Sequence, residues 1–226
     1  EWMAPLAVLL NNAHRELELE GVTARLEISR PMETVRIVGL SAPRTLPPAG
    51  STMTVLMSRV RGMINNLRIT VLVENTARGT GLLCEHGLAF WVEVDGCRIL
   101  FDTGQGAALY NNAEHLGVPL QTAEIIALSH GHYDHAGGVE TVLKIKSDIQ
   151  VYLHQAAMQP RYVRENDGAR PVRMPPGSMQ ALWSLEDDSI HWLTQPLKIT
   201  GRVGLSGPIP RHSSYEDSGG SFYYDP

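Results

Sequence analysis

The stretch 128–138, Leu-Ser-His-Gly-His-Tyr-Asp-His-Ala-Gly-Gly, constrains the fold of this chain more than any other part of the sequence. An apolar run, 123–129, leads into it and predicts a buried strand. Two glycines close it, at the start of a helical pattern at 136–145. Chain that leaves the carboxyl end of a strand and enters a helix is where α/β proteins place their chemistry. The sequence therefore predicts an α/β unit with a functional loop at this strand end.

Four side chains in this stretch are of the metal-ligand type: His130, His132, Asp134 and His135. Imidazole nitrogens and carboxylate oxygens are the ligands that Zn²⁺ and similar divalent metals accept. His130 and His132 are two residues apart, so in extended backbone they project to the same side. Asp134 and His135 fall in the turn that opens the next helix, where they can face a second metal. This density of ligand residues favours a metal site over an ordinary polar loop.

The spacing H-x-H-x-D-H resembles the signature of the metallo-β-lactamase superfamily, whose members fold as a four-layer αββα sandwich. The similarity begins at about Leu67 and is sharpest in four segments. These are Glu-His-Gly-Leu at 85–88, Leu-Phe-Asp-Thr-Gly-Gln at 100–105, the run 128–135, and Gly-Pro-Ile-Pro-Arg at 207–211. Together they resemble the branch of the superfamily that is similar to dihydropterin–ribofuranosylaminobenzene phosphate synthase.

The resemblance implies a role for each matching residue. His130 and His132 would bind a first metal, and Asp134 and His135 a second. Asp134 would also orient the attacking hydroxide, which makes it the predicted catalytic residue. Asp102, at the end of a predicted strand, would accept an imidazole N–H and so set the tautomer of a metal ligand. The alternative for Asp102 is an ordinary turn-capping role.

Three further residues are candidates for substrate binding. His86 lies in the Glu-His-Gly loop, which the branch resemblance places near the cleft, with a surface loop as the alternative. His154 ends a predicted strand and can line the site, although a structural role is favoured. Arg211 is a candidate anion clamp because a guanidinium suits phosphate or carboxylate. The same role is open to four other arginines in a Pro/Gly-rich stretch at 155–178 that predicts a long loop, although a solvated loop is favoured for them: Arg161, Arg164, Arg170 and Arg173.

The resemblance implies a metal-dependent hydrolase, in which a metal-activated hydroxide attacks an ester, a phosphoester or a related bond, or a relative that performs pterin-phosphate condensation. The expected cofactor is a divalent metal, with Zn²⁺ first, Mn or Fe as alternatives, and two ions in a complete site. The expected partner is a small-molecule substrate that can carry a phosphate. The alternative function is a non-catalytic module that binds or senses metal through an incomplete site.

That alternative arises because the family's later ligands find no match. Family members have a third histidine for the first metal, a bridging aspartate and a late histidine after the signature, and in this branch one lies in a Gly-Cys-Ser-His-type motif. This chain has no cysteine after Cys97. We therefore expect 63–226 to be a metallo-β-lactamase-like domain that is incomplete at its C-terminal end.

Residues 1–62 carry no family motif and are expected to be a separate α+β segment. It is either a small appendage or sequence foreign to the enzyme, and Met63, just ahead of the first family-like strand, favours the second reading. Within the main domain the hydrophobic patterns predict strands at 67–75, 88–94, 97–101, 124–129 and 149–153, and helices at 105–116 and 136–145.

Composition excludes several classes of protein. The 226 residues, 43% hydrophobic and 19% charged, are typical of a soluble globular chain. The net charge of −5, without a run of Lys or Arg, makes nucleic-acid binding an unfavoured function. No apolar stretch approaches the roughly 20 residues of a membrane span. Two cysteines, Cys84 and Cys97, are a poor disulfide framework, so a reducing cytoplasm is the expected location.

Overall fold

A computed structural model describes residues 66–166, 168–200, 203–209 and 222–225, together with three short strands nearer the N-terminus. Those strands are β1 (Leu26–Ser29), β2 (Thr34–Ile37) and β3 (Thr52–Val55). Arg211, the candidate anion clamp, lies outside the described residues.

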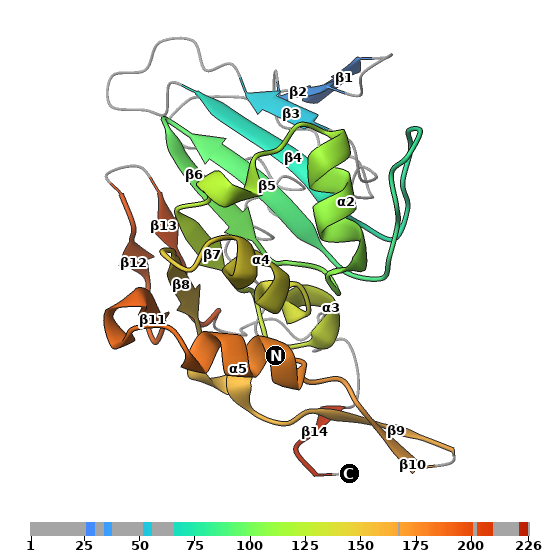
Figure 1. The fold of residues 1–226 in the computed structure, drawn as a ribbon, viewed down its shortest axis with the longest axis vertical. Helices are drawn as coiled ribbons and strands as arrows, with labels where there is room; N and C mark the ends of the chain where they lie inside the picture. The colour runs from blue at the N-terminus through green and yellow to red at the C-terminus, as the bar shows by residue number, and fades with distance from the viewer. Residues whose placement is uncertain are drawn as a thin grey trace.

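A nine-stranded mixed sheet organises the fold, in the order β1-β2-β3-β4-β5-β6-β7-β8-β11 (Figure 1). Its antiparallel centre turns between β5 and β6 at Asp95 and Gly96, which both have positive φ, as a tight hairpin requires. Its other half is parallel, so each of its strands is reached by a crossover that includes helical turns. The remaining strands are β4 (Leu67–Val73), β5 (Ala89–Val94), β6 (Cys97–Phe101), β7 (Ile125–Ala127), β8 (Gln150–Leu153) and β11 (Ile190–Trp192).

Helices cover one face of the sheet, as Figure 1 shows for α2 and α4. Side chains of the central strands alternate between a hydrophobic cluster beneath these helices and a second cluster on the opposite face. On β6, for example, Leu100 packs in the first cluster while Ile99 and Phe101 pack in the second. Burial of both faces explains why these strands read as nearly continuous apolar runs. The helices are α2 (Ala107–His115), α3 (Tyr133–Ala136), α4 (Val139–Ile145) and α5 (Pro176–Trp183).

The predicted strands and the helix at 105–116 are found with boundaries shifted by a few residues. The predicted helix 136–145 is instead the two helices α3 and α4, with Gly137 and Gly138 between them. These glycines pack directly on backbone: a Cβ on Gly138 would lie 2.4 Å from the carbonyl oxygen of Thr103. That close approach holds the loop after β6 against the start of α4.

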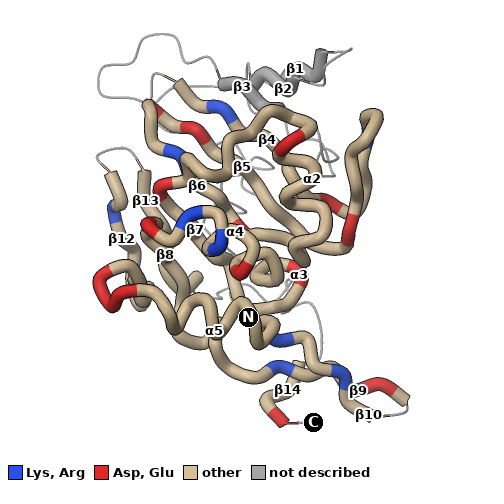
Figure 2. Tube along the Cα trace, in the orientation of Figure 1, with Lys and Arg blue, Asp and Glu red and all other residues tan. Residues whose placement is uncertain are grey.

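The prediction of a long loop at 155–178 was wrong. The stretch contains η3 (Gln155–Met158), β9 (Tyr162–Glu165) and β10 (Gly168–Pro171), and α5 begins within it. β9 pairs with β10 and also with β14 (Phe222–Tyr223), so a separate three-stranded sheet forms, which projects at the lower edge of Figure 1. Several Lys or Arg residues lie along the segment that forms this small sheet (Figure 2). Its pairing with β14 joins segments far apart in the chain, which local patterns do not reveal.

The other short elements are η2 (Leu120–Thr122), η4 (Asp187–Ser189), β12 (Leu197–Lys198) and β13 (Gly204–Leu205). The longest helix in the described ranges has nine residues. No helix in these ranges is long and apolar enough to cross a bilayer.

Candidate metal centre and adjoining pocket

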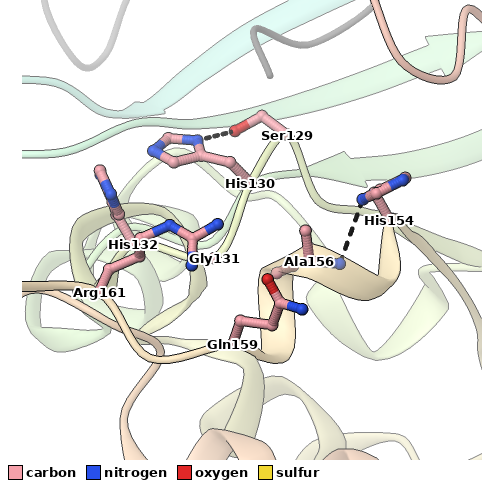
Figure 3. Close-up of a pocket in the computed structure, with 9 residues that line it drawn as sticks. Ser129, His130, Gly131, His132, His154, Ala156, Gln159 and Arg161 are labelled. Carbon is pink, nitrogen blue, oxygen red and sulfur yellow. Dashed lines mark hydrogen bonds between the residues drawn. The ribbon is translucent and has the colours of Figure 1, made fainter. Parts of the chain in front are cut away.

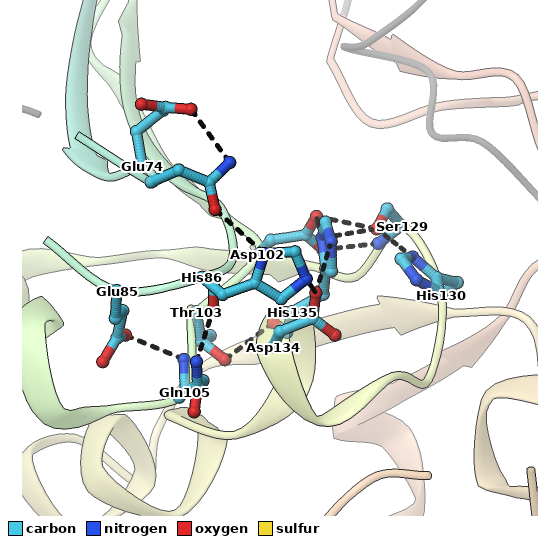
Figure 4. A network of polar contacts seen from close by, with 11 residues as sticks. Glu74, Glu85, His86, Asp102, Thr103, Gln105, Ser129, His130, Asp134 and His135 are labelled. Atoms are coloured by element: carbon cyan, nitrogen blue, oxygen red, sulfur yellow. Dashed lines mark hydrogen bonds and ion pairs between the residues drawn. The ribbon is translucent and has the colours of Figure 1, made fainter. Parts of the chain in front are cut away.

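The candidate metal-binding residues meet at the carboxyl ends of β6 and β7 (Figure 4). Asp102 directly follows β6, and His130 follows β7 by way of Ser129. His132 precedes the first turn of α3, which carries Asp134 and His135. Two backbone hydrogen bonds hold that turn in place, from Thr103 N to the carbonyl of His135 (2.7 Å) and from Leu88 N to the carbonyl of Asp134 (3.3 Å). Parallel pairing of β6 with β7 thus brings two loops distant in sequence to one place.

Asp102 holds Ser129 and His135 in place through hydrogen bonds to its buried side chain. Its side chain is completely buried, and its φ of 54° lies in the left-handed region that non-glycine residues rarely adopt. The carboxylate accepts hydrogen bonds from the backbone N–H and the hydroxyl of Ser129, and from Nδ1 of His135, each 2.7 Å long. A buried carboxylate with three donors is well compensated for its loss of water. This environment places Asp102 against an imidazole, as its anticipated supporting role requires.

These hydrogen bonds also determine which nitrogen of His130 carries the proton. Ser129 Oγ lies 2.7 Å from the Asp102 carboxylate and 2.8 Å from Nδ1 of His130. The hydroxyl has one hydrogen, and an ionised carboxylate has none to offer. Ser129 therefore donates to Asp102 and accepts from Nδ1–H of His130. In the neutral imidazole the lone pair is then on Nε2, the nitrogen that a metal would need.

Three imidazole rings cluster above Asp102. The ring centroids of His130 and His132 are 4.5 Å apart, and those of His130 and His135 are 4.3 Å apart. Asp134 Oδ2 lies 3.6 Å from Nε2 of His135 and 3.3 Å from Nε2 of His86, whose Nδ1 is held by Asn75 Oδ1 (Figure 4). The loop of His86 therefore reaches the edge of the cluster, close to Asp134.

The environments of the three histidines differ in their effect on protonation. Burial lowers the pKa of His130 well below its ordinary value, and repulsion by His135 and His132 lowers it further. Burial also lowers the pKa of His132, against an opposing effect of Asp134. Burial acts on His135 in the same direction, but the charge and hydrogen bond of Asp102 outweigh it and raise the pKa of His135. The lowered pKa values favour the neutral imidazole, the form that binds metals, at His130 and His132.

The donor set fits a divalent metal in chemical type, but the described residues supply only part of a coordination shell. No group of three or more His, Cys, Asp or Glu side chains within the described ranges is arranged so that it could hold a metal ion. His130 lies against both His132 and His135, and Asp134 lies beside His135. The assignment of His130 and His132 to a first metal and of Asp134 and His135 to a second therefore stays a prediction.

A pocket opens beside the histidine loop (Figure 3). Its floor is Gly131, where an added Cβ would lie only 1.9 Å from the carbonyl oxygen of Ala157 in η3, so no larger residue fits. His154 is in the wall, and its Nδ1 accepts a hydrogen bond from Ala156 N (3.1 Å), which places the proton of the neutral ring on Nε2. The lining residues are Ser129, His130, Gly131, His132, His154, Ala156, Ala157, Gln159 and Arg161.

Arg161, for which a solvated loop was favoured over an anion clamp, is half-buried, and its side chain lines this pocket. In Figure 3 Arg161 and His132 lie on the same side of the pocket, opposite His154. The charge of Arg161 also contributes to the lowered pKa of His132. Sequence reasoning offered Arg161 as an anion clamp but favoured a solvated loop for it, and it missed Ser129, although Ser129 directly precedes His130 and a hydroxyl there was a usable signal.

The sequence profile of the metallo-beta-lactamase superfamily matches residues 83–221, which is more than half of the chain. The chain belongs to the metallo-beta-lactamase superfamily. The predicted family and its mixed α/β fold are therefore confirmed.

Curated relatives of this superfamily member include two proteins of Methanocaldococcus jannaschii. One is an uncharacterized protein that is 32% identical over 151 residues, covering 66% of this chain and 56% of the relative. The other is 7,8-dihydropterin-6-methyl-4-(beta-D-ribofuranosyl)-aminobenzene-5'-phosphate synthase, 32% identical over 143 residues, covering 58% of this chain and 49% of the synthase. These similarities support a branch of the superfamily like that enzyme. The chain spans about half the length of the curated relatives it matches.

Among solved structures, the Rm3 metallo-beta-lactamase is similar with a TM-score of 0.39 and 18% sequence identity, over 64% of this chain and 48% of that one. The assignment of this chain to the superfamily depends on the sequence match over residues 83–221, and not on this partial structural similarity.

Proposed function

We propose that this chain supplies metal ligands of a metal-dependent enzyme that acts on an ester, phosphoester or related bond of a small molecule. The observation that carries the proposal is the convergence of His130, His132 and His135 above a buried aspartate that orients two of them. The proposed domain is 63–226, and the free state of Cys84 and Cys97 supports a reducing, cytoplasmic setting.

His130 and His132 would hold one divalent metal, and Asp134 and His135 a second, with Zn²⁺ suited best to this mixture of imidazole and carboxylate and Mn or Fe as alternatives. When bound, such a metal polarises a carbonyl or phosphoryl oxygen and lowers the pKa of water from 15.7 to about 7. Asp102 would keep the ligand face of His135 turned to the metal, and Ser129 would do the same for His130.

Asp134 is the residue proposed to act in the chemistry. Its carboxylate is mostly buried yet reaches His86 and His135, so it lies between the exposed loop and the imidazole cluster. A carboxylate there can accept a proton from an attacking water and keep the water oriented. His86, 69% exposed at its side chain, would contact substrate from the open side.

One relative is named as a synthase rather than a hydrolase, so the reaction of this chain is either cleavage of such a bond or a condensation that forms one. Both reactions require an activated nucleophile next to an electrophilic carbon or phosphorus. A substrate that carries phosphate is consistent with the synthase's name.

A second candidate function is a module that binds or senses metal without catalysis. It is favoured by the lack, within the described ranges, of three side chains that could hold one ion. A two-ligand site binds metal weakly, so its ion is lost to mild chelation.

Metal analysis and a substrate panel test the proposal together. We would measure Zn, Mn and Fe by mass spectrometry and then assay hydrolysis of phosphodiester, thioester and lactone substrates. We expect bound metal and turnover, with Asp134→Asn reducing turnover by about 10²–10⁴-fold and His115→Ala, on the distant helix α2, leaving it unchanged. Metal that binds without turnover on any substrate would favour the sensing module. A metal-free, inert protein with His130 and His132 intact would contradict both.

A further inference from the structure

The pocket beside the histidine loop has the chemistry of an anion site. None of its nine lining residues is Asp or Glu, and one of them, Arg161, is permanently charged. Gln159 adds an amide that can donate two hydrogen bonds. A guanidinium fork beside an amide suits an oxyanion such as a phosphoryl or carboxylate group.

Arg161 is also fixed relative to the histidine loop through its backbone. The carbonyl of Arg161 accepts a hydrogen bond from Val172 N (2.9 Å), and the carbonyl of Val172 accepts one from Tyr133 N (3.1 Å). Next to Tyr133, His132 forms a β-bridge with Arg173. One ladder of backbone bonds therefore joins the base of Arg161 to the loop that carries His130 and His132.

The side chain of Arg161 is braced by Tyr224, which directly follows β14. Its guanidinium carbon lies 3.9 Å from the ring centroid of Tyr224, and its Nη2 donates to the Tyr224 hydroxyl (3.1 Å). Its Nη1 donates to the carbonyl of Pro160 (2.8 Å). These contacts use two of the five N–H groups of the guanidinium. A braced arginine loses little side-chain entropy when it binds an anion.

The register of β9 and β14 shows which face of this small sheet meets the site. Phe222 pairs with Val163, and Tyr223 pairs with Tyr162. Side chains alternate between faces along a strand. The Phe222 ring contacts the His132 ring, with centroids 4.7 Å apart, so the face of Phe222 is directed to the histidine loop.

The same alternation separates Arg161 from Arg164. Arg161 is on the face of Phe222 and Tyr224, whereas Arg164 is on the opposite face, where its guanidinium carbon lies 4.3 Å from the ring centroid of Tyr223. Both arginines stack on a tyrosine of the same segment, but Arg164 does not line the pocket. Arg164 is therefore a matched control for Arg161.

We infer that Arg161 and Gln159 form an anion subsite that holds a phosphoryl or carboxylate group of the substrate next to the His130–His132 pair. Its use as a substrate subsite rests on the proposed function, but the binding of an anion does not. A substrate that bears such a group would be held with its reactive bond toward the imidazole cluster.

Binding of inorganic phosphate to the chelator-treated protein tests the subsite, because no metal is then present to bind the phosphate. Isothermal titration would compare wild type, Arg161→Gln and Arg164→Gln, with acetate as a second ligand. We expect Arg161→Gln to weaken phosphate binding roughly tenfold or more and Arg164→Gln to leave it within about twofold. The tighter of the two ligands in wild type identifies whether a phosphoryl or a carboxylate group is preferred.

A milder variant guards against loss of fold in Arg161→Gln. Tyr224→Phe keeps the ring and removes the hydroxyl that orients the guanidinium, and we expect about two- to fivefold weaker phosphate binding. Equal losses in Arg161→Gln and Arg164→Gln, or no phosphate binding by wild type, would overturn the subsite. Metal content, measured separately on the untreated proteins, distinguishes the proposals. If the untreated wild-type protein holds no metal but still binds phosphate through Arg161, the proposed function is contradicted and the anion subsite is supported.

Discussion

Asp102 and Ser129, 27 positions apart in the chain, are joined by two hydrogen bonds of 2.7 Å, one from the serine backbone and one from its hydroxyl. The same carboxylate holds His135, and the same hydroxyl holds His130. One buried acid therefore orients two imidazoles, the first directly and the second through a serine. A left-handed backbone at Asp102 is maintained at a cost of about 1–3 kcal/mol, which these hydrogen bonds offset.

Replacing Asp102 by Ala should weaken both folding and metal binding. Three donors would lose their acceptor, at about 1–3 kcal/mol for each one left buried and unsatisfied. Loss of an outer-sphere partner typically costs 10–100-fold in metal affinity. Thermal unfolding and competition with a zinc-binding dye would measure the two effects. Asp95→Asn, at another left-handed position in the β5–β6 turn, is the control and should change the metal affinity little.

Replacing Ser129 by Ala should remove the hydrogen bond that keeps the proton of His130 on Nδ1, without removing any candidate metal ligand. Nitrogen-15 chemical shifts of the metal-free protein would report which ring nitrogen carries the proton. Wild type should show a protonated Nδ1 and an unprotonated Nε2 on His130, and Ser129→Ala a mixture of the two forms. Ser129→Thr keeps the hydroxyl and should restore the wild-type spectrum. An unchanged spectrum in Ser129→Ala would contradict the hydrogen-bond assignment.

Gly131→Ala should disrupt the pocket. The new Cβ would meet the carbonyl oxygen of Ala157 at 1.9 Å, so η3 or the histidine loop must move. Overpacking of this kind costs about 1–3 kcal/mol of the free energy of unfolding. Gly204→Ala, where the nearest atom is a carbonyl oxygen at 3.2 Å, is the comparison and should be milder in denaturant unfolding. Equal effects from both variants would show that Gly131 is not tightly packed.

The two cysteines should differ in reactivity with pH. Burial raises the pKa of Cys97, and the charge and hydrogen bond of Glu124 raise it further, whereas Cys84 is exposed. Only the thiolate is alkylated, so a raised pKa lowers the reactive fraction of Cys97 at pH 8 and shifts its reaction to higher pH. Mass spectrometry after iodoacetamide treatment should find Cys84 modified first.

Glu124→Gln removes the negative charge near Cys97 and should speed its alkylation, while Cys84 serves as the internal control. Faster modification of Cys97 than of Cys84 in wild type would be the contrary result. Because Glu124 also pairs with Arg98 (2.7 Å), a melting curve of the variant must show that the fold is retained.

The sequence by itself determined the parts of this protein that depend on local pattern. Apolar runs predicted the central strands, Asp95-Gly96 predicted the hairpin, and the close spacing of His130, His132 and His135 predicted the candidate metal loop. Only the tertiary structure decided the partners of these residues. It decided that Ser129 bridges Asp102 to His130, and that Arg161, in a stretch predicted to be loop, is braced by Tyr224, 63 positions later in the chain. The reason is physical: periodicity reports the face that a residue presents, whereas strand pairing between distant segments decides which faces meet.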